Sequence, residues 1–422
     1  MKIKKDMFQA REEILENGLQ IISIQKDSNI FSLHVGMDIG AMYEKIEEKG
    51  ISHFIEHMLF KGTKKRDNHM INQAFEERAG AYDAYTDYDA TVFSITALAD
   101  ELEASVEILS DMLTNATFPS DEIEKEKKVI LAEVKAYKDD VEQYTYKKTN
   151  ELAFRQSPLK YDVIGVEKII KSFTKPQLEA FYHAHYIPNQ CIMSVVSPYS
   201  HDEIVEIIKK YFGKWKKGKI LDRKITIEKN HPLQKTSYKS NIEQNTLMYL
   251  YTFYGLSRKE ELALEILNHK LGVSANSILF QVLREDHGIA YDVYSEMDAT
   301  EAIKSLYIYT AVAEEDLGQA RNEVENCIEA IKTRKGMISE KDITLMKKVI
   351  KTGVASMLED AAGLSSYVLH QKISKKNIYG FIEDMENLEH IQEKDIFEIA
   401  QKVLKEPTIH VLRRKNKKEK EA

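Results

Sequence analysis

Cysteine is scarce in this sequence, and long hydrophobic runs are missing. Only two cysteines occur, Cys191 and Cys327, which lie far apart and have no C-x-x-C spacing. Neither a disulfide framework nor a thiolate zinc site is therefore indicated, and a reducing, cytoplasmic location is predicted. No apolar run approaches the roughly 20 residues that a membrane-spanning helix needs, so no membrane partner is expected. The opening segment MKIKKDMFQAREEILENG contains glutamates and no apolar stretch, which predicts neither an export signal nor a transit peptide.

An excess of positive charge is missing as well. Lysine and arginine number 60 against 68 aspartates and glutamates, which gives a formal net charge of −8. This mild acidity argues against nucleic acid as the main partner. Hydrophobic residues make up 43% of the chain and charged residues 30%, which excludes the collagen-like, disordered and membrane-embedded classes. The sequence is typical of a globular protein, and its length of 422 residues predicts two or more domains.

Short β-like runs alternate with long charged helical stretches. Branched and aromatic content, or alternation, predicts the strands, and helices lie between them. The predicted strands are Leu19–Gln25, Ile30–Met42, Thr91–Leu98 and Gln190–Ser197, and the predicted helices are His53–Phe60, Met70–Arg78, Ala99–Ala116 and Asp121–Asp140. We therefore predict an α+β fold of layered domains, each a mostly antiparallel sheet with helices packed on one face.

A linker is predicted near the middle of the chain. The segment Tyr211–Lys235 loses periodicity and gathers glycine, lysine and a proline. The order of elements then repeats in pattern, beginning with a strand at Asn245–Gly255 and a helix at Lys259–Gly272. The predicted domains are two homologous units at residues 1–220 and 241–422, joined by a linker at 221–240.

The stretch HFIEHMLFKGT has the spacing of a metal site. On a helix, His53 and His57 are one turn apart and can present two imidazoles to one ion, with Glu56 on the same side. Two neutral imidazoles and a carboxylate suit zinc. A histidine pair at this spacing also arises by chance in a long chain, so a third ligand is needed to decide between a metal site and an ordinary amphipathic helix. The second half of the chain has no counterpart of the pair.

The helix SDEIEKEKKVILAEVKAYKDD offers a candidate third ligand. A seam with helical spacing runs through Ile123, Glu126, Ile130, Glu133 and Tyr137. Glutamates that face the interior are costly unless they are paired or bind a metal, so this seam points to a buried cation. A competing stripe through Ile123, Lys127, Leu131 and Val134 turns both glutamates towards solvent. Spacing leaves both interpretations open.

Together, HFIEHMLFKGT and EKEKKVILAEV resemble peptidase family M16, the pitrilysin and insulin-degrading inverzincins. The resemblance covers nearly the whole chain and is greatest to the β-subunits of mitochondrial processing peptidase and their bacterial homologues. LREDHGIAYDVYS in the second half also resembles the family. The resemblance implies a zinc metalloendopeptidase that cleaves short or unfolded peptides inside a clamshell chamber.

The resemblance implies a role for each residue of the motif. His53, His57 and Glu133 would bind one zinc ion per chain, and Glu126 would orient a ligand histidine. Glu56 would be the general base that takes a proton from the attacking water.

The second half would supply two further catalytic residues. Arg284 and Tyr291 match the family's spacing and would hold or polarise the carbonyl of the substrate. A bound peptide would pair with the strand whose substrate-binding residues are Ala81, Tyr82, Asp83 and Ala84. Asp83 departs from the asparagine that is usual in the family, and an ionised carboxylate cannot donate a hydrogen bond to a peptide carbonyl.

The resemblance also implies a partner chain, because relatives of this length commonly pair. The expected partner is a second copy or a related M16 subunit. Two further functions stay open: a dedicated protease that matures one leader peptide together with a partner subunit, and a non-catalytic structural subunit of the same fold. The last of these is expected to carry a broken zinc motif, whereas His53, Glu56, His57 and Glu133 are all present. A coincidental match in an unrelated metal-binding or peptide-binding protein is the remaining alternative, which an absence of zinc binding would favour.

Overall fold

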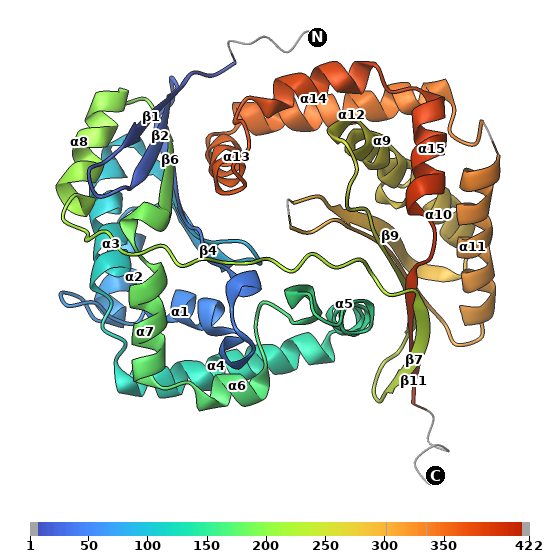
Figure 1. Cartoon of the computed structure of the whole chain (residues 1–422), viewed down its shortest axis with the longest axis horizontal. Helices are drawn as coiled ribbons and strands as arrows, with labels where there is room; N and C mark the ends of the chain where they lie inside the picture. Colours follow the sequence, from blue (N-terminus) through green and yellow to red (C-terminus); the bar gives the residue numbers. More distant parts are fainter. Residues whose placement is uncertain (1–6, 301, 335, 416–422) are drawn as a thin grey trace. The chain divides into compact units, whose positions relative to one another are not determined.

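The computed structural model describes residues 7–300, 302–334 and 336–415. The chain forms two compact units, each built from three segments (Figure 1). Unit 1 contains Met1–Lys135, Tyr161–Ile225 and Val354–Gly380, and unit 2 contains Ala136–Lys160, Thr226–Gly353 and Phe381–Ala422. Each unit has one mostly antiparallel sheet with helices, which confirms the predicted α+β fold.

Six strands form the sheet of unit 1 in the order β1-β2-β6-β3-β5-β4. The pair β2 and β6 is parallel, and the other neighbours are antiparallel. The strands are β1 (Ala10–Ile14), β2 (Gln20–Gln25), β3 (Ile30–Met37), β4 (Ala81–Thr86), β5 (Thr91–Leu98) and β6 (Cys191–Ser197). The four strands predicted in this unit correspond to β2, β3, β5 and β6, but β3 ends at Met37 and not at Met42. Sequence patterns found neither edge strand: four residues of β1 and three of β4 are exposed, so neither has a buried alternating face.

The helices of unit 1 are α1 (Ile51–Leu59), α2 (Asn68–Glu76), α3 (Leu102–Asn115), α4 (Ser120–Asp139, which continues into unit 2), α6 (Glu167–Ser172), α7 (Lys175–His185), α8 (His201–Phe212) and α13 (Ala361–Ile373). Helices α1 to α4 follow the predicted positions closely, whereas α6, α7, α8 and α13 were not predicted from the sequence. Short 3₁₀ turns occur at Ala41–Tyr43, Ile46–Glu48, Ala99–Glu101 and Pro188–Gln190. The long predicted helix at Asp121–Asp140 corresponds to α4 within one residue at each end.

Side-chain alternation along β3 gives the sheet of unit 1 two covered faces. Phe31, Leu33 and Val35 are fully buried in the core that also contains α1 and α3. His34 and Gly36 point to the opposite face, because neighbours along a strand alternate. That face is covered by α13, whose Ser365 lies 3.0 Å from Nδ1 of His34.

Five strands form the sheet of unit 2 in the order β7-β11-β8-β10-β9. The strands are β7 (Leu233–Lys239), β8 (Asn245–Thr252), β9 (Ala290–Asp298), β10 (Ser305–Val312) and β11 (Thr408–Arg414). The helices are α5 (Val141–Ala153), α9 (Arg258–Asn268), α10 (Ile278–Phe280), α11 (Leu317–Thr333), α12 (Glu340–Glu359, which continues into unit 1), α14 (Gly380–Glu389) and α15 (Glu393–Val403). A 3₁₀ turn at Pro158–Lys160 and two π-helical turns at His269–Val273 and Gln281–Asp286 complete the unit.

An exchange of helices between the two halves of the chain distinguishes the units from the predicted domains at 1–220 and 241–422. Helix α13 comes from the second half and packs on β3 and β6 of unit 1. Helix α5 comes from the first half and packs on β8 and β11 of unit 2, where the hydroxyls of Thr145 and Thr246 are 2.7 Å apart. Each sheet therefore has helices on both faces, whereas sequence periodicity predicts one covered face. The stretch 213–232, within the predicted linker region, has no helix or strand.

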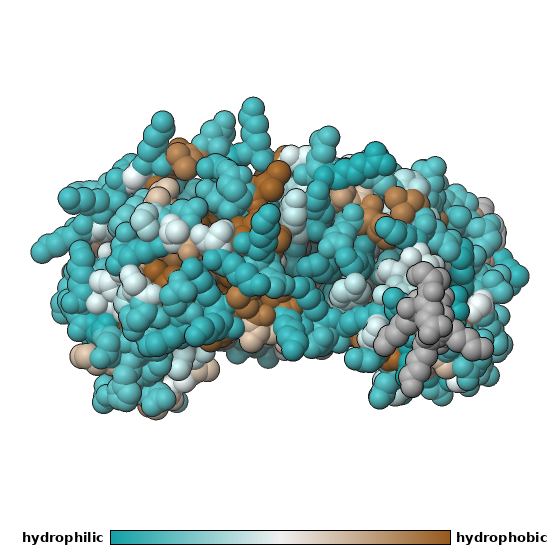
Figure 2. Space-filling view, turned by 90° about the horizontal axis from the view of Figure 1, so that it is seen from below, coloured by the Kyte–Doolittle hydropathy of each residue, from teal (hydrophilic) through white to brown (hydrophobic). Residues whose placement is uncertain are grey.

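The face of the molecule in Figure 2 is mainly hydrophilic and is interrupted by hydrophobic patches. Within the described residues, no helix combines the length and the apolar character that crossing a membrane requires.

Candidate metal centre

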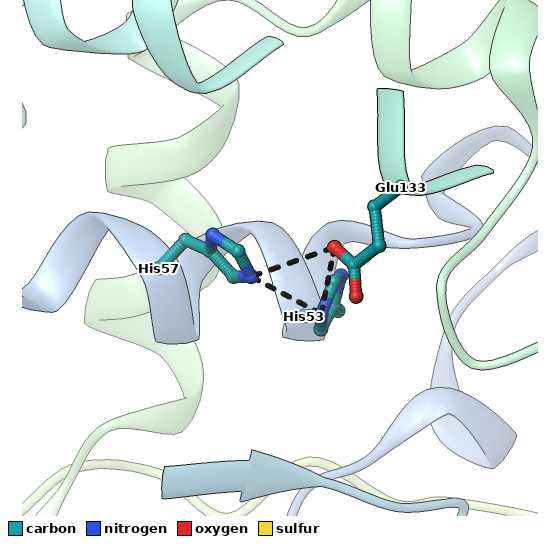
Figure 3. Close-up of side chains that lie close together, drawn as sticks. All are labelled: His53, His57 and Glu133. Carbon is teal, nitrogen blue, oxygen red and sulfur yellow. Dashed lines mark hydrogen bonds and ion pairs between the residues drawn. The ribbon is translucent and has the colours of Figure 1, made fainter. Parts of the chain in front are cut away.

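Helix α1 places two histidines on one side of its axis. Its apolar residues Phe54, Ile55 and Met58 are fully buried, so the helix is held firmly in the core of unit 1. The imidazoles of His53 and His57 project together from the remaining face, and their Nε2 atoms are 3.2 Å apart (Figure 3). This arrangement follows directly from the spacing of one helical turn.

Glu133 of α4 completes a three-residue group. Its Oε2 lies 3.9 Å from Nε2 of both His53 and His57 (Figure 3). All three potential ligand atoms lie within 4.8 Å of one another. Two ligand atoms bound to a tetrahedral zinc ion at about 2.0–2.1 Å are about 3.4 Å apart. The separations of the three atoms therefore fit such an ion, and their N, N, O chemistry suits zinc.

Glu126 lies behind His57 and determines its tautomer. The side chain of Glu126 is 3% exposed, and its Oε2 is 3.1 Å from Nδ1 of His57. Its Oε1 is 2.8 Å from Nζ of Lys61. A buried carboxylate accepts hydrogen bonds, so Nδ1 of His57 carries the proton and the lone pair of Nε2 faces the other ligands. Burial would raise the pKa of Glu126, but the hydrogen bonds from His57 and Lys61 outweigh it and lower that pKa.

The buried face of α4 takes residues from both of the stripes that its sequence allows. Its buried residues are Ile123, Glu126, Ile130 and Val134. The seam that contains Glu126 is therefore buried in the first half of the helix. Glu133 is half-buried, and Tyr137 at the end of the predicted seam is 42% exposed. A half-buried carboxylate can contact an ion and still leave that ion accessible to a substrate.

Burial and neighbouring charges set the protonation of the three candidate ligands in a way that favours a cation. Burial, with a smaller contribution from His57, lowers the pKa of His53 to about 4, so its imidazole is neutral at pH 7 and its lone pair is available. Burial alone would lower the pKa of His57, but the hydrogen bond to Glu126 and the charges of Glu56 and Glu133 raise it. Burial raises the pKa of Glu133. Three carboxylates around one imidazole create a negative potential that a metal ion would offset.

Glu56 is on the same helix and is 8% exposed. Its Oε2 accepts a hydrogen bond of 2.8 Å from the hydroxyl of Thr86. Burial raises the pKa of Glu56, and the neighbouring charges of Glu133 and Asp83 also raise it, whereas Thr86 and His57 lower it. A buried carboxylate with a raised pKa beside the candidate ligands is the type of group that accepts a proton in hydrolysis.

The four predicted substrate-binding residues lie on β4, which is the edge strand of the sheet of unit 1. β4 pairs with β5 alone among the described strands, so its other edge is open to a further strand. The ring of Tyr82 stacks on Phe75 at 4.7 Å. Ala81 and Asp83 are exposed, and Ala84 is half-buried.

Arg284 and Tyr291 belong to unit 2, whereas the three candidate ligands belong to unit 1. Arg284 is exposed in the π-helical turn Gln281–Asp286, with its guanidinium 5.0 Å from the centre of the Phe280 ring. Tyr291 lies on the edge strand β9 and is 73% exposed.

Sequence reasoning missed three residues that support α1. Lys61 lies just beyond the end of α1, with its Nζ 2.8 Å from Oε1 of Glu126, so helical spacing within α1 does not reach it. Glu44 caps α1 by accepting hydrogen bonds from the backbone N–H groups of Gly50 and Ser52, at 2.9 and 2.8 Å. Thr86 contacts Glu56 only because β4 folds against α1, and a local pattern carries no signal for that contact.

Two family models match the chain one after the other. The model described as Insulinase (Peptidase family M16) matches residues 20–167, and the model described as Peptidase M16 inactive domain matches residues 172–350. An uncharacterized zinc protease of Bacillus subtilis, YmxG, is 30% identical over 348 residues, which cover 82% of this chain and 83% of that protein. The chain belongs to peptidase family M16. The predicted resemblance to this family is thus confirmed.

Further matches agree with membership of family M16. Mitochondrial-processing peptidase subunit beta of Bos taurus is 33% identical over 207 residues, 49% of this chain and 42% of that protein. The crystal structure of a protease from Helicobacter pylori matches with a TM-score of 0.90 and covers 96% of this chain and 99% of that chain. Because its sequence is only 20% identical, the similarity to the Helicobacter pylori protease concerns the fold alone.

Proposed function

We propose that the protein is a zinc metalloendopeptidase that cleaves short or unfolded peptides. The observation that carries this proposal is the group of His53, His57 and Glu133, whose potential ligand atoms lie within 4.8 Å of one another. Glu56, the candidate general base, is on the same helix as the two histidines. The zinc-protease names of M16 relatives support the choice of metal.

The three ligands fit one zinc ion per chain. When bound, zinc supplies a Lewis acid that lowers the pKa of a water molecule and polarises a peptide carbonyl. Glu126 holds the Nδ1 proton of His57 and so keeps Nε2 free for the metal. Glu56 accepts the proton of the attacking water as its oxygen bonds to the peptide carbon, and then donates that proton to the leaving amine as the C–N bond breaks.

The open edge of β4 supplies a binding mode for the peptide. An extended peptide can add to this edge through backbone hydrogen bonds, with Ala81, Tyr82, Asp83 and Ala84 as its contacts. This mode requires an extended chain, which favours short or unfolded substrates over folded proteins. Arg284 and Tyr291 are proposed to hold the carbonyl of the same peptide. The clamshell chamber that the resemblance implies stays a prediction.

A non-catalytic role is the second candidate, because the model that matches residues 172–350 is described as an inactive domain. The histidine pair and Glu133 lie in the other matched segment, residues 20–167. The description thus concerns a segment without a counterpart of the zinc motif, which favours catalysis by unit 1. A dedicated protease for one leader peptide would use the same residues and differ only in its substrate.

A partner chain and a cytoplasmic location are part of the proposal. The bovine relative is named as a subunit, which supports a homodimer or a heterodimer with a related M16 chain. Both cysteines are free and buried, which agrees with a reducing compartment. Light scattering of the purified protein and fractionation of cells test these two points.

Zinc content and hydrolysis of a quenched peptide library test the proposed function. Wild-type protein is expected to hold about one zinc per chain and to cut peptides. Glu56→Gln is expected to hold zinc without turnover, because the amide cannot accept the proton. Glu76→Gln, the same change at an exposed position of α2, is the matched control and is expected to keep both properties. Zinc binding without hydrolysis by wild type, alone or with a partner chain, favours the non-catalytic role. Absence of zinc binding refutes the metallopeptidase proposal.

A further inference from the structure

The carboxylate of Glu56 has a specific hydrogen-bond donor on another element. The hydroxyl of Thr86, the last residue of β4, donates to Oε2 of Glu56 at 2.8 Å. Thr86 is half-buried, and the side chain of Glu56 is buried. Among the described residues, Thr86 is the donor found for this carboxylate.

The single proton of the Thr86 hydroxyl is directed to Glu56 by its surroundings. Thr91 lies directly opposite on β5, with its hydroxyl oxygen 3.5 Å from that of Thr86. The Thr91 hydroxyl donates to the carbonyl of Ile39 at 3.0 Å, so its own proton is engaged. Since a carboxylate can only accept, the bond between Thr86 and Glu56 has a defined direction.

The position of Thr86 follows from the geometry of the sheet. Residues that face each other across paired strands point to the same face, so Ala84 shares a face with Phe93, and Thr86 shares it with Thr91. Phe93 is in the core beneath α1, and this face is therefore the one that α1 covers. The intervening Tyr85 points to the other face, where its hydroxyl is 2.8 Å from Nε2 of His370 in α13. The strand is thus held from both sides.

We propose that Thr86 is a positioning residue for the general base Glu56. Rotation about the terminal torsion of a glutamate is soft, with broad minima. The Thr86 hydroxyl fixes Oε2 and so turns Oε1 towards the position of the attacking water. The inference rests on the proposed peptidase function. It also links two parts of that function, because the strand proposed to pair with the peptide also holds the base.

Two substitutions at Thr86 separate positioning from structure. Thr86→Val removes the hydroxyl and keeps the branched shape that suits a strand, whereas Thr86→Ser keeps the hydroxyl. With zinc-loaded protein and a quenched peptide, Thr86→Val is expected to lower kcat about tenfold or more. KM, zinc content and melting temperature are expected to stay near wild-type values. Thr86→Ser is expected to retain kcat within about threefold.

Thr96→Val is the matched control on the neighbouring strand. The Thr96 hydroxyl also makes one hydrogen bond of 2.8 Å, to Oγ of Ser32, but it points to the face covered by α13. This variant is expected to keep kcat. An unchanged kcat in Thr86→Val, an equal loss in Thr86→Ser, or a loss of kcat that accompanies loss of zinc or stability overturns the inference while the peptidase function stands. An inactive wild type refutes the proposed function, and the inference falls with it.

Discussion

Replacement of Glu126 by glutamine tests how the structure prepares His57 for a metal. The carboxylate accepts from two sides, with Oε2 3.1 Å from Nδ1 of His57 and Oε1 2.8 Å from Nζ of Lys61. A glutamine has one acceptor oxygen, so its NH₂ group must face one of these two donors. If it faces His57, the proton of the imidazole is driven to Nε2, where it blocks the lone pair that the metal needs. If it faces Lys61, an ammonium group loses its partner in a largely buried site.

The size of the expected loss of zinc affinity in Glu126→Gln follows from this geometry. Loss of the partner of a metal-binding histidine typically weakens metal binding about 10-fold to 100-fold. That range equals about 1.4–2.8 kcal/mol. Because Glu126 is 3% exposed, water is poorly placed to replace the lost bond, and the upper part of the range is expected. The measurement is a competition for zinc against a chromogenic chelator, which needs no peptidase activity.

Glu124→Gln is the matched control for this experiment. Glu124 is on the same helix, two positions earlier, and is exposed, with its Oε1 2.8 Å from Nζ of Lys127. Such a surface pair contributes little, so zinc affinity is expected to stay within about twofold of wild type. Wild-type affinity in Glu126→Gln would refute the role assigned to Glu126. An equal loss in both variants would show that the effect is the general loss of negative charge from α4.

Two further predictions concern the stability of the fold. The carboxylate of Glu228 accepts from the backbone N–H groups of Arg155, Gln156 and Ser157, and its Oε1 is 2.9 Å from Nε2 of His231. Burial would raise the pKa of Glu228, but these hydrogen bonds outweigh it and lower the pKa to about 2. Because its pKa is lowered, the ionised carboxylate stabilises the folded state at every pH above 4.5, the ordinary pKa of the group. This stabilisation is lost as the pH falls from 4.5 towards 2. Glu228→Gln is therefore expected to lower the free energy of unfolding by about 2 kcal/mol at pH 7. The urea midpoints of the variant and the wild type are expected to converge near pH 2. A difference between the two midpoints that stays constant from pH 7 to pH 2 contradicts the stabilising role of ionised Glu228. For Gly36→Ala, an added Cβ would lie 2.9 Å from the Cδ1 atoms of Ile373 and Leu369, so these side chains of α13 have to move, at a cost of about 1 kcal/mol. Gly353→Ala, in open space within α12, is expected to raise the melting temperature instead. If the melting temperature changes in the same direction in both variants, the packing argument is refuted.

Local periodicity in the sequence was sufficient for much of the fold and for the centre of the candidate site. The strand β3 was predictable because its apolar residues alternate, and α1 because its apolar residues recur with helical spacing. The pairing of His53 and His57 follows from one turn of one helix, which needs no tertiary information. Burial of Glu126 was one of two open interpretations, because a helix as apolar as the middle of α4 offers more than one face for packing.

Only the tertiary structure decided which distant segments meet. The exchange of α5 and α13 between the halves has no local signature, because the sequence of a helix indicates which of its faces is apolar but not which sheet covers that face. The contact between Thr86 and Glu56, 30 positions apart, depends on how β4 folds against α1. A sequence pattern records the spacing of residues along one element and hence the face that each side chain occupies. Which other element covers that face depends on the packing of the whole unit. The candidate ligand pair could therefore be predicted from the sequence, whereas the residues that contact these ligands and Glu56 required the folded structure.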